Sequence, residues 1–328
     1  MANTISDKLT YLEGTKSAIK DAIVAKGVAV SDSDTFRSYA DKIGQISGGE
    51  VFDVTKTGLT FSYCNMHHSQ FEKLNWTINP SIADISHLFV YSNLSDSYID
   101  LGSKLDTSVS YLAKDSFKQA NIHQIGINSG QPFNNPSGMF NGTVSPNSTL
   151  QDIVFNITES YIPFVFYYTD INTTGTITVN IKNGINASLD YFMYGYNGNE
   201  ICDKIVFNEY NSSTLALNEF FYTSNINLTK IPEIDLTAVD NYTFRGLITG
   251  GEMTSITTFG GITNLKVDLN LQWLPNLNAE SVDNILNKAN DLTGNPTQTI
   301  TFNSTVYNAL TEEQKSLAAS KNWTLASA

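Results

Sequence analysis

The chain has 328 residues, 41% of them hydrophobic, and a formal net charge of −13 at pH 7. The hydrophobic content allows a sizeable core, whereas the negative charge argues against partners with anionic surfaces, both nucleic acid and membrane. Only Cys64 and Cys202 are present, too few and too far apart for a disulfide framework or a zinc knuckle, so we expect two buried thiols.

The N-terminal region has no apolar core typical of a signal peptide, and no apolar run is long enough to cross a bilayer. We therefore expect a soluble protein that is made in a cytoplasm, with no membrane insertion.

The first predicted element is an amphipathic helix. Its apolar residues, interrupted by one lysine, are spaced 4, 3, 4, 3 and 4 residues apart, at Ile5, Leu9, Leu12, Lys16, Ile19 and Ile23. This spacing is typical of the a/d seam of a coiled coil. Gly27 suits the left-handed position that follows a helix.

A second helix is predicted to begin at Asp34 or Thr35, and Gly48-Gly49 predicts a hinge after it. Its apolar face contains Phe36, Tyr39, Ile43 and Ile46. Because so small a helical hairpin cannot bury its own apolar stripe, we expect residues 1–47 to be an independent anchor. Packing on the rest of the chain is the alternative. The expected attachment or oligomerisation residues are Ile5, Leu9, Leu12, Ile19, Ile23, Phe36, Tyr39 and Ile43.

This region also carries a resemblance. The stretches Asp7-Lys8-Leu9-Thr10-Tyr11-Leu12, Lys26-Gly27-Val28, Val30-Ser31-Asp32 and Asp34-Thr35-Phe36-Arg37-Ser38-Tyr39 are similar to an N-terminal module of virion proteins of tailed phages, notably crAss-like phages of gut Bacteroidetes. The resemblance covers residues 7–43. It implies attachment to other virion proteins, of the capsid, the tail or a fibre, and a location in the virion after assembly in the host cytoplasm.

Residues 50–80 are the least informative part. Phe52–Val54 and Leu59–Tyr63 predict two short strands around Lys56-Thr57-Gly58.

Farther along the chain, two periodic series are interleaved. Apolar-x-apolar triplets start at Ile99, Ile125, Ile153, Val179, Ile205, Ile234 and Val267, and an aromatic residue recurs between them at Phe117, Phe140, Phe166, Phe192, Phe220 and Phe244. We interpret each triplet as one strand of a parallel sheet. Each aromatic residue is expected to point inward from a return segment.

Segments such as Ser116-Phe117, Thr243-Phe244 and Leu228-Thr229-Lys230-Ile231 resemble BspA-type leucine-rich repeats. We therefore expect an α+β protein: a helical hairpin followed over residues 50–328 by an irregular leucine-rich-repeat solenoid.

Residues 270–328 are expected to form a C-terminal cap. Asn278 predicts the start of a helix containing Val282, Ile285 and Leu286, and Thr299–Phe302 predicts a strand. Thr311 with Gln314 forms a capping box that opens another helix, and Trp323-Thr324-Leu325 closes the edge.

No known catalytic motif is present, and no cofactor or metal is expected. The adjacent His67 and His68 would face opposite sides of a strand, which argues against joint metal binding. Asp100, Asp235 and Asp268 occupy the centres of triplets, and Asp235 and Asp268 could be neighbours on one face. Aromatic residues are concentrated in three successive repeats, where Tyr167, Tyr194 and Tyr196 are the expected surface residues. The expected ligand contacts are therefore Tyr167, Tyr194, Tyr196, Asp235 and Asp268.

Taken together, these features favour a non-enzymatic structural or decoration protein of a phage virion, such as a head or tail fibre, that binds a host-surface glycan or a protein. Two alternatives stay open: a BspA-like bacterial surface adhesin, which would need an export signal, and a virion-bound polysaccharide depolymerase, which would need an acid pair. A homo-oligomer is expected, with a trimer favoured.

Overall fold

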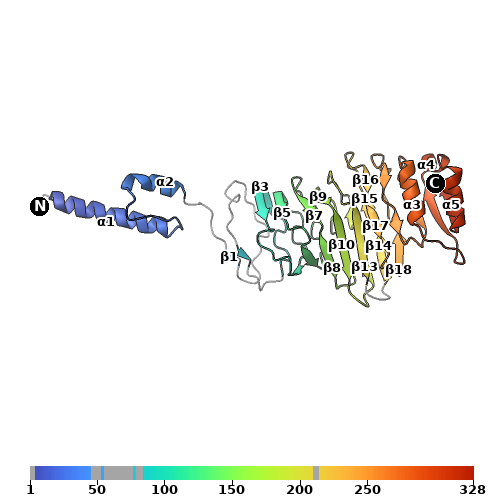
Figure 1. Ribbon diagram of the computed structural model, residues 1–328, viewed down its shortest axis with the longest axis horizontal. Coiled ribbons are helices and arrows are strands. Elements are labelled where there is room, and N and C mark those ends of the chain that lie inside the picture. The colour runs from blue at the N-terminus through green and yellow to red at the C-terminus, as the bar shows by residue number, and fades with distance from the viewer. Residues whose placement is uncertain (1–3, 46–52, 55–76, 79–83, 210–213) are drawn as a thin grey trace. The chain divides into compact units, whose positions relative to one another are not determined.

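The computed structural model describes residues 4–45, 53–54, 77–78, 84–209 and 214–328 (Figure 1). The chain divides into two compact units, the first made mainly of residues 1–52 and the second mainly of residues 76–328. The predicted hinge at Gly48-Gly49, the predicted strand at Leu59–Tyr63, Cys64 and the pair His67-His68 lie outside the described residues.

The first unit contains one long helix, α1 (Ile5–Val24), a 3-10 turn, η1 (Phe36–Ser38), and a short helix, α2 (Tyr39–Gly44). Thr4 and Asp7 form a capping box at the start of α1, and Gly27 adopts a left-handed conformation (φ +81°) after its end. The expected helical hairpin is therefore wrong, because the second segment does not form a full helix. The second segment is broken at its start by the 3-10 turn and ends at a glycine, which leaves only six helical residues.

The largest sheet of the second unit has seven strands, all parallel. In spatial order they are β20 (Ile262–Thr263), β17 (Glu233–Asp235), β13 (Lys204–Glu209), β10 (Thr176–Ile181), β8 (Val154–Ile157), β6 (Pro132–Asn134) and β4 (Tyr111–Leu112). We call the segment from one of these strands to the next a layer. The register is regular, so that Val179 lies between Phe155 and Phe207.

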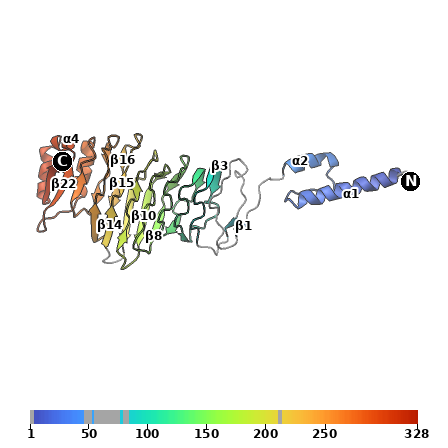
Figure 2. The ribbon, with the colours of Figure 1, turned by 180° about the vertical axis from the view of Figure 1, so that it is seen from behind.

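Several smaller parallel sheets are formed by other segments of the second unit (Figure 2). They comprise β1 (Asp53–Val54) with β2 (Thr77–Ile78), β3 (Asn93–Asp100) with β5 (Asn121–Gly126), β7 (Thr149–Gln151) with β9 (Asn172–Thr174), β11 (Ala187–Ser188) with β14 (Thr214–Asn218) and β18 (Asn241–Arg245), β12 (Met193–Tyr194) with β15 (Phe221–Tyr222), and β16 (Lys230–Ile231) with β19 (Thr258–Phe259). The last sheet contains β21 (Leu269–Leu271), β22 (Gln298–Phe302) and β23 (Trp323–Ser327).

This arrangement overturns the expected leucine-rich-repeat solenoid with one strand per repeat. The triplets at Ile99 and Ile125 lie in the separate sheet of β3 and β5, and the triplet at Val267 leads into β21, whereas the intervening triplets belong to the seven-stranded sheet. The physical reason is that alternating apolar residues mark any half-buried strand, and each layer contains more than one. The sequence pattern therefore joined strands of different sheets into one series.

The recurring aromatic residues form a stack in the core. Phe89, Phe117, Phe140 and Phe166 lie face to face, with ring centroids 5.4, 5.4 and 5.2 Å apart. Phe166 then meets Phe192 edge to face at 5.7 Å. Phe192 in turn stacks on Phe220 at 5.0 Å. The predicted inward position of the series is confirmed up to Phe220; Phe244 is half-exposed and packs on Tyr242 instead.

Beyond the layers lie α3 (Ala279–Lys288), α4 (Ser304–Asn308) and α5 (Glu312–Ser320), drawn in orange and red in Figure 1. Asn278 caps α3 and the Thr311–Gln314 capping box opens α5, as the sequence predicts. The predicted strands are β22 and β23, and β23 is the edge strand of its sheet.

Candidate binding surface

Six aromatic side chains gather on the surface of the second unit: Phe164, Tyr167, Tyr168, Tyr191, Tyr194 and Tyr222. We call this set the tyrosine patch. All six are half-exposed or exposed, and they come from three successive layers. A cluster of this kind stands apart from the singly scattered apolar residues that any protein surface carries.

The rings of the patch pack mainly on one another. Phe164 stacks on Tyr191, with centroids 5.3 Å apart and planes 15° apart, and Tyr167 stacks on Tyr194 at 5.7 Å and 17°. Tyr194 continues to Tyr222, its register partner across β12 and β15, at 5.0 Å. Edge-to-face contacts link these two rows, with Phe164 and Tyr167 at 4.9 Å and Tyr191 and Tyr194 at 5.6 Å. Tyr168 joins them through Tyr167 at 4.6 Å. The patch is therefore a connected array rather than a set of independent side chains.

The backbone beneath the patch is unusual. Phe164, Tyr168 and Tyr191 adopt left-handed conformations, with φ of 61°, 50° and 57°. Bulky residues rarely adopt positive φ, and such strain persists only where surrounding structure holds it. Hydrogen bonds to the next layer do so here: the Phe164 N–H donates to the Asp190 carbonyl at 3.0 Å, and the Tyr168 N–H to the Tyr194 carbonyl at 2.9 Å.

Glycines in the next layer make room for two of the rings. A β-carbon at Gly195 would overlap the Tyr168 ring, and one at Gly250 would overlap the Tyr222 ring. Both glycines have positive φ, a second reason for the absence of a side chain. The rings of Tyr168 and Tyr222 are thus seated directly on the backbone of the next layer.

The phenol groups of Tyr167 and Tyr194 are neutral over the physiological range. Partial burial raises the pKa of Tyr167, and the neighbouring Tyr168 and Tyr191 hydroxyls and the Glu219 carboxylate raise it further. The pKa of Tyr194 is raised for the same reasons, burial first. Each hydroxyl therefore remains able both to donate and to accept a hydrogen bond.

Three tyrosines were expected at the surface, and two of them, Tyr167 and Tyr194, lie in the patch. Tyr196 does not: it is fully buried, and its hydroxyl donates to the Glu200 carbonyl at 2.5 Å. Burial raises its pKa. In a strand successive side chains alternate between the two faces, and Tyr194 and Tyr196 were expected to share one. The left-handed Gly195 between them breaks the alternation.

The acidic residues expected to be neighbours are not. Asp235 in β17 pairs in register with Thr263 in β20, whereas Asp268 precedes β21 in a different sheet. Asp235 Oδ2 is 2.5 Å from Lys204 Nζ, and Asp268 Oδ1 accepts a hydrogen bond from the Thr299 N–H at 2.7 Å. Asp100 Oδ1 accepts from the Ser103 N–H at 3.0 Å in a turn after β3. These three carboxylates do not share a site.

A different acidic pair does occur in β17 of the seven-stranded sheet, beside the edge strand β20. Glu233 lies 3.2 Å from Lys204 and 2.6 Å from Lys288, and Asp235 shares Lys204 with it. Burial alone would raise the pKa of each carboxyl, but hydrogen bonds from the lysines outweigh it, and both pKa values lie below their ordinary range. Both groups are therefore ionised and paired.

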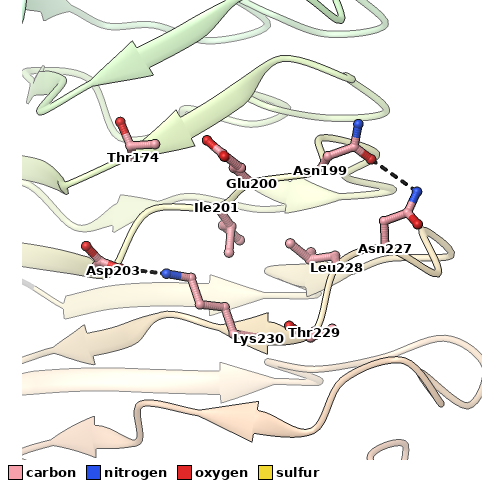
Figure 3. A pocket seen from close by; sticks show the side chains of 9 residues that line it. All are labelled: Thr174, Asn199, Glu200, Ile201, Asp203, Asn227, Leu228, Thr229 and Lys230. Atoms are coloured by element: carbon pink, nitrogen blue, oxygen red, sulfur yellow. Dashed lines mark hydrogen bonds and ion pairs between the residues drawn. The ribbon is translucent and has the colours of Figure 1, made fainter.

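A small polar pocket of about 340 Å³ lies beside β16 (Figure 3). Ile201 and Leu228 are buried at its base. Its polar groups pair with one another: Lys230 Nζ is 2.5 Å from Asp203 Oδ1, and Asn227 donates to the Asn199 side chain at 3.3 Å. A ligand there would have to displace these pairs, so the tyrosine patch is the stronger candidate.

A ladder of asparagines runs along the seven-stranded sheet, which the sequence reasoning missed. Asn180 Nδ2 donates to Asn156 Oδ1 at 2.9 Å, and Asn208 Nδ2 donates to Asn180 Oδ1 at 3.0 Å. Asn134 joins through Ser110, whose hydroxyl donates to Asn134 and accepts from Asn156. A sequence pattern could have predicted the ladder, because each of these asparagines directly follows a buried apolar residue: Phe133, Phe155, Val179 or Phe207.

The expected attachment residues of the first unit differ in exposure. Ile5, Leu9, Leu12, Phe36 and Ile43 are exposed, and Ile19 is half-buried. Ile23 and Tyr39 are buried where α1 and α2 contact each other, so a partner could not reach these two.

Among the described residues, no group of three or more His, Cys, Asp and Glu side chains is placed to hold a metal ion. Within the same part of the chain, no helix has the length and apolar character needed to cross a membrane. Comparison with protein-family models, with curated protein sequences and with solved structures finds no match to this chain.

Proposed function

We propose that this chain is a non-enzymatic component of a phage particle that binds a protein partner through the tyrosine patch. The patch is the observation that carries the proposal. Attachment to the particle through the first unit is inferred from the resemblance of residues 7–43 to phage virion modules, and the exposed side chains of Phe36 and Ile43 support it.

The ring geometry favours a protein partner over a glycan. Sugar rings bind aromatic side chains by stacking on a free ring face. In the patch, the faces of Phe164 and Tyr191 cover each other, as do those of Tyr167 and Tyr194. Each of these four rings therefore has one face covered by its stacked partner. Clustered tyrosines that offer apolar area with a polar tip are typical of the centres of protein interfaces.

The charge state of Glu233 and Asp235 argues against this pair as the acid pair of a glycosidase. A glycosidase needs one carboxyl with a raised pKa to act as general acid. Glu233 and Asp235 have lowered pKa values because Lys204 and Lys288 hold them as carboxylates. Neither carboxyl can serve as the proton donor at neutral pH.

The patch is tested by cell binding. Fluorescently labelled full chain is titrated onto host bacteria that are untreated, protease-treated or periodate-treated. We expect the double variant Tyr167→Ala/Tyr194→Ala to lose at least about tenfold in affinity, since interface tyrosines contribute roughly 2 kcal/mol or more when truncated. Protease treatment of the cells should abolish binding, whereas periodate should not.

The control is Tyr98→Ala, which removes an exposed tyrosine of β3 that is no part of the patch and should bind like the unmodified chain. Loss of binding after periodate but not protease would show that the partner is a glycan, contrary to the proposal. Equal binding by the double variant and the control would contradict the proposal that the tyrosine patch binds the partner.

The particle location is tested separately. Antibodies against the second unit, applied to intact phage and viewed by electron microscopy with gold labels, should mark a fixed position on the head or the tail. Absence of the chain from purified particles, by mass spectrometry, would contradict the virion assignment while leaving the patch measurement intact.

A further inference from the structure

The two ends of α1 differ in how their apolar seam is covered. At the N-terminal end, Ile5, Leu9 and Leu12 are 79%, 55% and 58% exposed. At the other end, Ile23 is buried. The apolar surface of the first part of the helix therefore lies in water, which is unfavourable unless another surface covers it.

The short helix α2 accounts for the covered end. α1 and α2 contact each other, Tyr39 at the start of α2 is buried, and Lys16 Nζ lies 5.9 Å from the centroid of the Tyr39 ring. The one polar residue of the seam is therefore held by an aromatic face within the same chain. The seam is therefore half-buried at Lys16 and Ile19, buried at Ile23, and exposed before Lys16.

The charges beside the open part are complementary to those of a second copy. With Leu9 and Lys16 at a positions and Ile5 and Leu12 at d positions, Lys8 falls at g and Glu13 at the following e position. In a parallel coiled coil, g of one helix faces e of the next heptad on its neighbour. Lys8 of one chain would then face Glu13 of another, and both side chains are exposed.

We infer that copies of this chain associate in parallel through residues 5–13 of α1, with Lys8 of each copy paired to Glu13 of its neighbour. An antiparallel arrangement would place g opposite g and e opposite e, so that like charges would meet. Isoleucine at d with leucine at a disfavours the two-stranded form and favours three or four chains.

The test is a charge swap in the full chain, read by sedimentation velocity over a concentration series. Lys8→Glu and Glu13→Lys should each raise the concentration for half-assembly roughly tenfold, because attractive pairs become repulsive. The double variant Lys8→Glu/Glu13→Lys should restore the original value. A mixture of the two single variants should assemble better than either alone.

Circular dichroism of each variant shows whether α1 still forms. If the single variants keep their helical content and assemble as the unmodified chain does, the pairing is wrong; if the unmodified chain sediments as a monomer at all concentrations, self-association is wrong.

Orientation has its own readout. In a parallel assembly the a position of one chain meets the same position of its neighbours, so Leu9→Cys should give a disulfide-linked species under mild oxidation. Glu13→Cys, displaced from its counterpart, serves as the control. Cross-linking of the control but not of Leu9→Cys would contradict the parallel arrangement.

Discussion

At the scale of single residues, the second unit is held by side chains that meet their equivalents one layer away. Asn156, Asn180 and Asn208 exchange amide hydrogen bonds, and Phe117, Phe140 and Phe166 stack face to face. Polar partners along the sheet leave few unpaired amides, while the stacked rings exclude water from the centre. A change at one position therefore affects two neighbours.

Phe140 is the clearest case, because it is fully buried between Phe117 and Phe166. Phe140→Ala should lower the free energy of unfolding by about 3–5 kcal/mol, from lost burial and the cavity left behind. Denaturant unfolding followed by circular dichroism measures it. Phe244→Ala, at a half-exposed ring, should cost far less; equal losses would argue against the stack as the centre of the core.

The paired acids predict how stability depends on pH. Because the pKa values of Glu233 and Asp235 are lowered in the folded state, they stabilise it above the ordinary carboxyl pKa range, and that stabilisation is lost as pH falls through their folded pKa values. Lys204→Met should therefore reduce the fall in unfolding free energy between neutral pH and about pH 3.

The control for this measurement is Lys230→Met. Lys230 pairs with Asp203, whose side chain is 76% exposed and contributes little. For Lys230→Met, the dependence of the unfolding free energy on pH should match that of the unmodified chain. If Lys204→Met also matches the unmodified chain, the pairing of Glu233 and Asp235 with Lys204 is not the cause of the loss of stability at low pH.

Prediction of single residues was correct where the repeat spacing determines whether a side chain is buried. It was wrong where the local backbone conformation determines this. The buried phenylalanines follow from their spacing, and Tyr167 and Tyr194 from their concentration in successive repeats. Tyr196 was misplaced because left-handed Gly195 shifts the side-chain alternation. The asparagine ladder was missed because no single residue reveals that its equivalents lie in register.

At the scale of elements, α1, α3 and α5 were predictable, whereas the division of the strands among sheets was not. Helix caps depend on a few neighbouring residues. The start of α3 is predicted by Asn278, and the start of α5 by Thr311 with Gln314. Which strands pair in one sheet depends on contacts between segments distant in the sequence. The alternation of apolar residues predicts a strand but not its pairing partner. For this reason the repeat pattern predicted the wrong architecture, a leucine-rich-repeat solenoid.

The cap of α3 can be tested directly. Asn278 Oδ1 accepts from the Ser281 N–H at 2.8 Å and from its hydroxyl at 2.7 Å. Asn278→Ala should reduce the unfolding free energy by about 1 kcal/mol, whereas Asn278→Asp keeps the acceptor and should be close to neutral. Equal losses from both substitutions in thermal unfolding would mean that the side-chain oxygen is not what stabilises this end.

At the scale of the whole molecule, the two compact units predict separable behaviour. Deleting residues 1–47 should leave the circular dichroism and cooperative unfolding of the second unit intact, because its stacked phenylalanines and paired strands all lie beyond that segment. The truncated chain should also fail to remain with phage particles. Loss of cooperative unfolding on truncation would mean that the first unit is part of the fold rather than an anchor.

The open seam of α1 has a consequence for how long the tyrosine patch stays bound. Once one copy in an assembly engages, its companions search only the volume that their tether allows, and the local ligand concentration they experience can reach the millimolar range. Individually weak contacts then combine into a long residence time, with no additional contact at any single patch. Lys8→Glu should shorten that residence time without touching a tyrosine.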